Sequence, residues 1–469
     1  MFASFSARWT RGRGTFRLAA ATLVSGLVAV GALAGAGTAT AAEPTQTQAG
    51  ATATIGGLKT YGAAMIHDAS GDVQVSAGLF EMSVDGGGML QTYCVDLHNP
   101  TQRDAKYQET SWSGTSLGAN KNAGKIRWIL ENSYPQVNDL ATLAAEAGAK
   151  GLTEQDAAAG TQVAIWRYSD GADVDAVDPQ AEKLADYLQK AAVSVPEPQA
   201  SLTLDPPAVS GHPGELLGPV TVHTNATGVT LTPPADAATT GVRIVGKDGK
   251  PLTSAVNGSQ VFFDVPEDAA AGSAELTVQA STTVPVGRAF TSDSRSQTQI
   301  LAGSSESTVS ATASATWAKQ GAIPALSAVK NCAKGGLDIT AANQGDEPFT
   351  FSLMEATYSI PAGESRTVTI PLQEDQQYDF TITGPNGFDQ RFTGILDCRT
   401  QGSSGNGDAV QTLAEPSPAT VGGVADDTNL AATGGSSVTP LIAGVAIGLV
   451  VIGGAALVLV GKKNAPTGE

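Results

Sequence analysis

The chain has 469 residues and a formal net charge of −18, with 45 acidic and 27 basic side chains. This acidic balance disfavours nucleic acid and anionic lipid as partners. The length allows several domains. The three cysteines leave one thiol without a disulfide partner if the other two pair.

The first 42 residues are typical of a secretory signal peptide. Four arginines between residues 8 and 17 precede a small and apolar stretch, residues 18–34, and Ala39-Thr40-Ala41 matches a cleavage site. We therefore expect an exported protein whose mature chain begins at Ala42 or Glu43.

Composition predicts three folded units after this signal. Residues 53–195 mix strand-like and helix-like periods and hold most of the tyrosines and tryptophans, which indicates an α+β domain rich in strands. A proline-punctuated linker, residues 195–199, leads into a Val- and Thr-rich region, residues 201–317. We expect two all-β Ig-like sandwich domains, the first over residues 201–317 and the second over residues 322–399.

Cys332 and Cys398 stand at the two ends of the last of these units. The first and last strands of such a sandwich can be neighbours, so we expect a disulfide, which would stabilise the unit by about 4 kcal/mol. The spacing also resembles a small cystine-bearing β-domain found ahead of wall-anchoring signals in high-GC Gram-positive proteins. Cys94 then remains as a spare thiol in an oxidising compartment, a liability unless chemistry uses it.

The end of the chain is predicted to lie outside any folded domain. Residues 400–429 are rich in Gly, Ser, Pro and Asp and too poor in apolar side chains to fold, which predicts a disordered wall-spanning spacer. Residues 441–460 form an apolar run long enough for a transmembrane helix, and Lys462 and Lys463 follow it.

Residues 430–469 as a whole resemble a sortase sorting signal. Its pentapeptide is Leu430-Ala431-Ala432-Thr433-Gly434, with Ala431 where the usual motif has proline. The resemblance implies that sortase cuts after Thr433 and joins it to a peptidoglycan precursor. The protein would then be secreted and covalently anchored to the cell wall, and its precursor would be held transiently in the membrane.

Cys94 is predicted to lie in a strand, because alternating segments over residues 73–84 and 89–97 flank three glycines and favour a β-hairpin. A helix is predicted from Thr153, an N-cap paired with Asp156, to about Tyr168. Gln162 lies on an apolar stripe of that helix. Periodicity alone does not distinguish a reactive amide there from a buried one that hydrogen-bonds the backbone.

The two segments resemble the thioester domain of Gram-positive surface adhesins. The first is Tyr93-Cys94-Val95-Asp96 and the second is Thr161-Gln162-Val163-Ala164-Ile165-Trp166, which matches the family's T-Q-x-A-I-W motif. The resemblance implies an internal thioester in which Cys94 supplies the sulfur and Gln162 the acyl carbon, with loss of ammonia. The residues expected to support that bond are Tyr93, Asp96, Thr161, Ala164, Ile165 and Trp166.

These features predict an adhesin-like surface protein whose thioester forms an amide with an amine on a partner, with protein lysine as the expected amine. Such a protein is a reagent and not an enzyme. It needs no cofactor, and the four scattered histidines predict no metal site. Asp96 and His98 are candidate helpers of the reaction.

Two alternatives remain open. One is a noncovalent wall-bound binding or spacer protein with an inert Cys94. The other is a cysteine hydrolase or transpeptidase, with Cys94 as the nucleophile and His98 or His67 as the base. The helix motif around Gln162 has no place in the second alternative.

Overall fold

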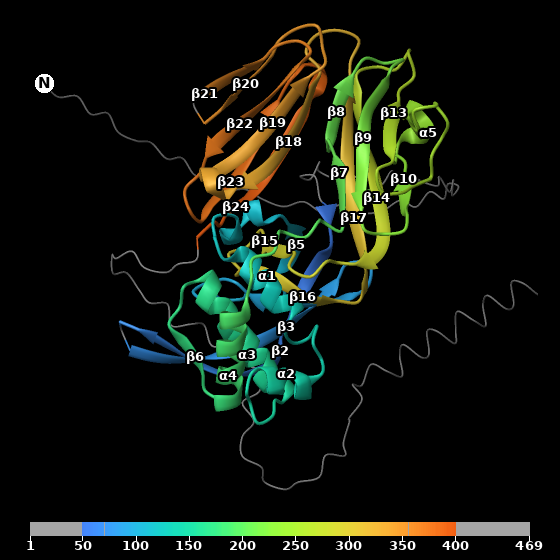
Figure 1. Cartoon of the computed structure of the whole chain (residues 1–469). Helices are drawn as coiled ribbons and strands as arrows, with labels where there is room; N and C mark the ends of the chain where they lie inside the picture. The colour runs from blue at the N-terminus through green and yellow to red at the C-terminus, as the bar shows by residue number, and fades with distance from the viewer. Residues whose placement is uncertain (1–48, 70, 355, 400–469) are drawn as a thin grey trace, which may run out of the picture.

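The computed structural model describes residues 49–69, 71–354 and 356–399 (Figure 1). The predicted signal peptide, wall spacer and sorting signal, including the apolar run at residues 441–460, lie outside these residues. No helix within the described part has the length and apolar character that crossing a membrane requires.

The first unit is built on a seven-stranded sheet of order β3-β4-β16-β15-β5-β2-β6. A long hairpin joins β2 (Thr52–Asp68) to β3 (Gly71–Val84), and β4 (Met89–Cys94) follows β3 through the three glycines, all at positive φ. This is the predicted hairpin, with Cys94 as its last strand residue. β5 (Lys106–Thr110) and β6 (Val174–Ala176) also belong to this sheet.

Two strands of this sheet come from much later in the chain. β15 (Ala289–Ser292) pairs with β5, and β16 (Gln299–Ser304) pairs with β4, so that Gln299 lies opposite Cys94. The prediction that residues 201–317 form one separate domain is therefore wrong for these two strands. Their period-two pattern is the same in either sheet, so the sequence does not show to which sheet they belong.

The helices of the first unit pack with this sheet in one apolar core. α3 (Glu154–Ser169) contacts both the β2–β3 hairpin and α4 (Pro179–Ala191). Every residue from Ala157 to Trp166 is buried, because α3 is covered by strands on one side and by a helix on another. The remaining helices are α1 (Ala123–Glu131), α2 (Leu140–Glu146) and the short η1 (Trp112–Gly114) and η2 (Ser116–Gly118).

The second unit consists of two sheets that share one apolar core. One sheet has the order β1-β17-β14-β10-β12, with β8 added parallel to β17, and the other has the order β11-β13-β9-β7. The bounds of the first sheet are β1 Ala49–Gly50, β8 Ala208–Gly211, β10 Val229–Thr232, β12 Ser254–Ala255, β14 Gly272–Thr283 and β17 Glu306–Trp317. Those of the second are β7 Leu202–Asp205, β9 Leu216–Thr224, β11 Arg243–Val245 and β13 Gln260–Asp264, and the helical turn α5 spans Ala237–Thr240. The chain therefore leaves the first unit after α4, builds most of the second, returns for β15 and β16, and then adds β17 to the second.

The third unit, orange in Figure 1, has small sheets around its own core. Its strands are β18 Pro324–Asn331, β19 Gly336–Asn343, β20 Phe349–Leu353, β21 Ala356–Ile360, β22 Glu364–Pro371, β23 Gln376–Thr383 and β24 Asp389–Leu396, with the short helices η3 Cys332–Lys334 and η4 Pro385–Gly387. A disulfide joins Cys332 to Cys398 with their Cα atoms 5.2 Å apart, which confirms the predicted pairing. Cys94 is left as a free, buried cysteine.

Candidate functional site

Cys94 and Gln162 meet where the end of β4 lies against α3. Gln162 Oε1 accepts a hydrogen bond from the backbone N–H of Cys94 at 3.0 Å, and its Nε2 donates to the carbonyl of Cys94 at 2.8 Å. Both side chains are buried. The Gln162 amide therefore uses its two polar atoms on the backbone of Cys94, which is the backbone-bonded arrangement that periodicity left open.

A different amide reaches the sulfur. Gln297 lies in the loop between β15 and β16, and its Oε1 contacts Cys94 Sγ closer than an ordinary hydrogen bond. The family resemblance implies a bond between Cys94 and Gln162, whereas the structure brings Gln297 to the thiol. The two residues are 203 positions apart, and only the pairing of β16 with β4 brings them together.

Hydrogen bonds fix the loop that carries Gln297. Tyr107 donates its hydroxyl to the carbonyl of Gln297 at 2.9 Å and lies 2.7 Å from Ser296 Oγ. The amide of Gln297 also donates to Thr101 Oγ1 in the segment that follows β4. Just after the loop, Gln299 at the start of β16 accepts a hydrogen bond at its Oε1 from the buried Thr92 of β4, at 2.9 Å. The loop is therefore held at several points beside the sulfur.

Two carboxyl groups lie close to the thiol. The backbone N–H of Asp96 is 3.3 Å from Cys94 Sγ, and the Asp96 side chain accepts a hydrogen bond from Asn99. Asp170, the C-cap of α3, accepts from the N–H of Leu97 at 3.0 Å. Burial raises the pKa of Asp96 to about 7, helped by the nearby charge of Asp170, and burial raises the pKa of Asp170 to about 6.

The thiol itself is in a poor environment for a free nucleophile. Burial, together with the charges of Asp170 and Asp96, holds the pKa of Cys94 well above its ordinary value. The thiolate is the reactive form of cysteine, so a free Cys94 would react slowly at neutral pH. This environment suits a sulfur that is protected or bonded more than one that attacks substrates.

The histidines proposed as bases lie in other surroundings. His67 is at the tip of the β2–β3 hairpin, with its Nδ1 2.8 Å from Asp72 Oδ1. The hydrogen bond with the Asp72 carboxylate raises the pKa of His67. His98 is exposed and interacts with the charge of Asp68. Within the described residues, no hydrogen bond joins a histidine to Cys94. The geometry therefore offers no Cys–His pair for a hydrolase.

The other residues of the two motifs build the walls of the site. Tyr93 donates its hydroxyl to the carbonyl of Tyr134 at 2.8 Å, and Thr161 donates to the carbonyl of Ala157 at 2.7 Å. Ala164, Ile165 and Trp166 are buried in the same core as Cys94. The indole Nε1 of Trp166 is buried and makes no hydrogen bond within the described part of the chain.

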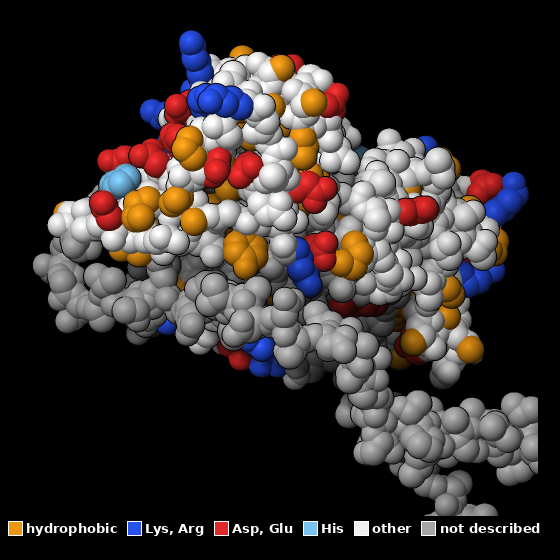
Figure 2. All heavy atoms as spheres, turned by 90° about the horizontal axis from the view of Figure 1, so that it is seen from below, with side chains coloured by type: hydrophobic (Ala, Val, Ile, Leu, Met, Phe, Trp, Pro, Cys, Tyr) orange, Lys and Arg blue, Asp and Glu red, His pale blue; other side chains and the backbone are white. Residues whose placement is uncertain are grey.

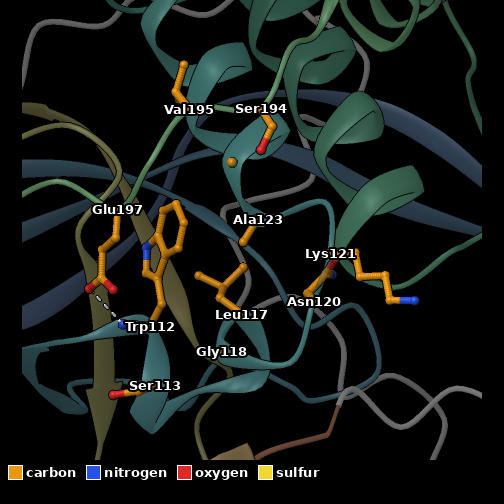
Figure 3. A pocket seen from close by; sticks show the side chains of 11 residues that line it. Trp112, Ser113, Leu117, Gly118, Asn120, Lys121, Ala123, Ser194, Val195 and Glu197 are labelled. Atoms are coloured by element: carbon orange, nitrogen blue, oxygen red, sulfur yellow. Dashed lines mark hydrogen bonds between the residues drawn. The ribbon is translucent and has the colours of Figure 1, made fainter.

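Two hollows flank the helical turns after β5, away from the sulfur. The larger, about 340 Å³, opens beside Trp112, whose backbone N–H donates to Glu197 (Figure 3). The other, about 280 Å³, lies between Ser169 at the end of α3 and Cys398 of the third unit. Cys94 and Gln297 line neither hollow. On the face shown in Figure 2, acidic, basic and apolar side chains are interspersed, so charge there does not single out a partner.

Comparisons with known proteins bear on two of the units. Residues 91–194 match the sequence model of the thioester domain family, and residues 321–395 match that of the C-terminal domain of bacterial phospholipase C. A search of curated proteins gives no match. The first match contains Cys94, Gln162 and both motifs, but it ends about a hundred residues before Gln297.

Two solved structures are similar over much of their length. The Bacillus anthracis TIE protein is 14% identical, with a TM-score of 0.26, and the match covers 74% of this chain and 81% of that one. The thioester domain of the Enterococcus faecium TIE86 protein is 15% identical, with a TM-score of 0.27, and the match covers 58% of this chain and 99% of that one. These scores are too low to carry an argument, so the assignment rests on the family match.

Proposed function

Because residues 91–194 form a thioester domain by their family match, we propose that an internal thioester between Cys94 and Gln297 captures an amine on a partner surface. The observation that carries this proposal is the contact between Cys94 Sγ and the Gln297 amide. When the thioester forms, the sulfur bonds to Cδ of Gln297, the C–N bond breaks and ammonia leaves.

Gln297 is preferred over Gln162 as the acyl donor because of what each amide already does. To reach the sulfur, Gln162 would have to give up both of its hydrogen bonds to Cys94 and leave a buried N–H and a buried carbonyl unpaired. Each such loss costs about 1–3 kcal/mol. Gln297 already lies against the sulfur and gives up only the hydrogen bond from its amide nitrogen to Thr101, which leaves with the ammonia. In our proposal Gln162 holds the backbone of Cys94 in place and Gln297 reacts.

Capture then follows the chemistry of a buried acyl group. An uncharged amine attacks Cδ of Gln297, an amide forms and the Cys94 thiol is released. Only about one lysine in 2,500 is uncharged at pH 7 when its pKa is near 10.4. Random encounters would therefore be slow, and a docked partner would gain most of the rate by proximity. Burial of Cys94 protects the bond from water until then.

The remaining parts of the proposal concern where the protein acts. We propose that it is an adhesin-like reagent and not an enzyme, that the captured amine belongs to a protein lysine, and that sortase anchors the chain to peptidoglycan through Thr433. The resemblance of residues 430–469 to a sortase sorting signal supports the last point. An anchored chain that forms a covalent link to its partner would hold that partner at the cell wall.

Methylamine labelling tests both the bond and the choice of glutamine. We expect the purified protein to lack one ammonia, and methylamine to add its whole mass and free one thiol, which leaves the labelled protein heavier than the unmodified sequence by one CH2 group. Trypsin cleaves after Arg295 and Lys319, so a labelled Gln297 appears in peptide 296–319, whereas a labelled Gln162 appears in peptide 151–167. Fragmentation of the first peptide separates Gln297 from Gln299.

The control variants are Gln297→Ala, which should have the full mass and a free thiol, and Gln299→Ala, which alters the neighbouring amide. An unmodified mass for the folded wild-type protein would contradict the thioester and favour a noncovalent binder. A label on Gln162 would instead restore the pairing that the sequence motif implies.

A further inference from the structure

Two buried polar atoms beside the sulfur have no hydrogen-bond partner in the described residues. One is Oδ1 of Asp96, a side chain that is 1% exposed, and the other is the indole Nε1 of Trp166. An unsatisfied buried polar group costs about 1–3 kcal/mol, so each such group calls for an explanation.

Both groups are placed to act on the sulfur when it leaves. The backbone N–H of Asp96 faces Cys94 Sγ at 3.3 Å, and the indole N–H of Trp166 favours the thiolate, which partly offsets the raised pKa of Cys94. The backbone N–H of Asp96 thus faces the atom on which negative charge develops as the C–S bond breaks, and Trp166 is buried in the same core as Cys94. Donors aimed at developing charge in a buried site are a large source of rate enhancement.

We propose that the Asp96 carboxyl is the acid that protonates the leaving sulfur of Cys94 during amine capture, while the N–H groups of Asp96 and Trp166 stabilise it. This inference rests on the proposed thioester. The amine nitrogen bonds to Cδ of Gln297 and the C–S bond breaks. The Asp96 proton passes to Sγ, and the surplus proton of the new amide returns to the Asp96 carboxylate, which restores its starting state.

The surroundings keep Asp96 in the form that this role needs. The titratable groups that face it are Cys94, Asp170 at the end of α3, Tyr107 on β5 and Asp397 at the end of the third unit. Burial and Asp170 raise the pKa of Asp96 to about 7, so about half of the molecules carry its proton at neutral pH. An ordinary aspartate would be almost fully ionised there and unable to donate.

The test measures thiol release by methylamine as a function of pH in the wild type and in Asp96→Asn. Below about pH 7 the wild-type rate should rise about tenfold per pH unit with the uncharged amine. Above that pH the loss of the Asp96 proton cancels this gain and the rate should level off. In Asp96→Asn we expect a rate at least about tenfold lower at pH 6–7 that keeps rising through the whole range.

Asp170→Asn is the matched variant. It keeps an oxygen to accept the Leu97 N–H but removes the charge that helps to raise the pKa of Asp96. The levelling of its profile should therefore move to lower pH, a shift that a purely structural role for Asp96 would not produce. If Asp96→Asn does not fold or does not form the thioester, the role of Asp96 is still tested by comparing the pH at which the wild-type and Asp170→Asn rates level off.

Two outcomes would overturn the role of Asp96 while leaving the thioester intact. One is an Asp96→Asn protein that lacks one ammonia yet reacts at the wild-type rate. The other is a wild-type profile that does not level off near pH 7, or one that Asp170→Asn leaves unshifted. A wild-type protein with the full, unmodified mass is a different result, since it removes the proposed function and this inference with it.

Discussion

At the scale of single residues, the site shows how two glutamines beside one cysteine differ only in what their amides touch. Gln162 bonds the N–H and carbonyl of Cys94, whereas Gln297 contacts its sulfur. The first is a positioning residue and the second is the proposed reactant. Both are buried, so neither burial nor residue type separates the roles. The two roles are separated by the part of Cys94 that each amide contacts, the backbone for Gln162 and the sulfur for Gln297.

Removal of the Gln162 amide should weaken the fold while leaving the reactive pair intact. In Gln162→Ala both backbone groups of Cys94 lose their partner, and we expect the free energy of unfolding to fall by about 2–4 kcal/mol. Urea denaturation measures this loss. Gln155→Ala, an exposed position on the same helix, is the control and should change stability by no more than about 0.5 kcal/mol.

The methylamine label in Gln162→Ala should still appear at Gln297, with fewer molecules carrying the bond because Cys94 is held less firmly. A stable variant with no trace of the thioester would instead assign the acyl carbon to Gln162.

At the scale of elements, α3 carries the site because its start and end are well defined. Thr153 and Asp156 form a reciprocal capping box, and Asp170 is the C-cap. Thr153→Ala removes one half of the box and should lower the free energy of unfolding by about 1 kcal/mol. In the control Gln155→Ala, an exposed polar side chain of the same turn is lost, so the change should be a few tenths of a kcal/mol. Equal losses in the two variants, measured by thermal unfolding, would contradict the role of the cap.

The elements that the sequence predicts well are those with local signals. The hairpin before Cys94 has its glycine turn, and α3 has Thr153 and Asp156 within four residues of each other. β15 and β16 have no such signal, because their partners are β5 and β4, near the start of the chain. For the same reason, the sequence does not single out Gln297 as the proposed acyl donor. Gln297 follows a short polar stretch, Ser294-Arg295-Ser296, that is indistinguishable from an ordinary loop.

At the scale of the whole molecule, the first unit is complete only after the chain has passed through most of the second. Ion pairs of the buried Arg288 stabilise this arrangement. Arg288, just before β15, bonds Glu109 of β5 at 2.9 Å and Glu197 of the linker at 2.7 Å, and the N–H of Ser201 donates to Glu109 at 2.9 Å. The linker, the returning strand and the sheet therefore meet at one buried cluster.

This topology predicts that the first unit cannot be isolated by cutting at the linker. A fragment of residues 49–200 lacks β15, β16 and Gln297, leaving β4 and β5 with unpaired edges. We expect it to unfold without a cooperative transition and to have a titratable Cys94, whereas residues 49–320 should fold and lack one ammonia. Circular dichroism and intact mass measure both properties. A folded, thioester-bearing fragment of residues 49–200 would show that the two late strands are dispensable.

The late return of the chain also determines how a captured partner would pull on the protein. After capture, the partner is bonded to Gln297, and the proposed anchor lies beyond residue 399. Tension therefore runs along the backbone through β16, β17 and β18 to Cys332, and the disulfide to Cys398 carries it across the third unit. The strands from β2 to β14 precede Gln297 and lie outside this covalent path. They can unfold or be cleaved without breaking the link, whereas a partner bonded to Gln162 would load α4 and the whole inserted unit. Mechanical strength in this molecule is thus a property of the segments between residue 297 and the anchor.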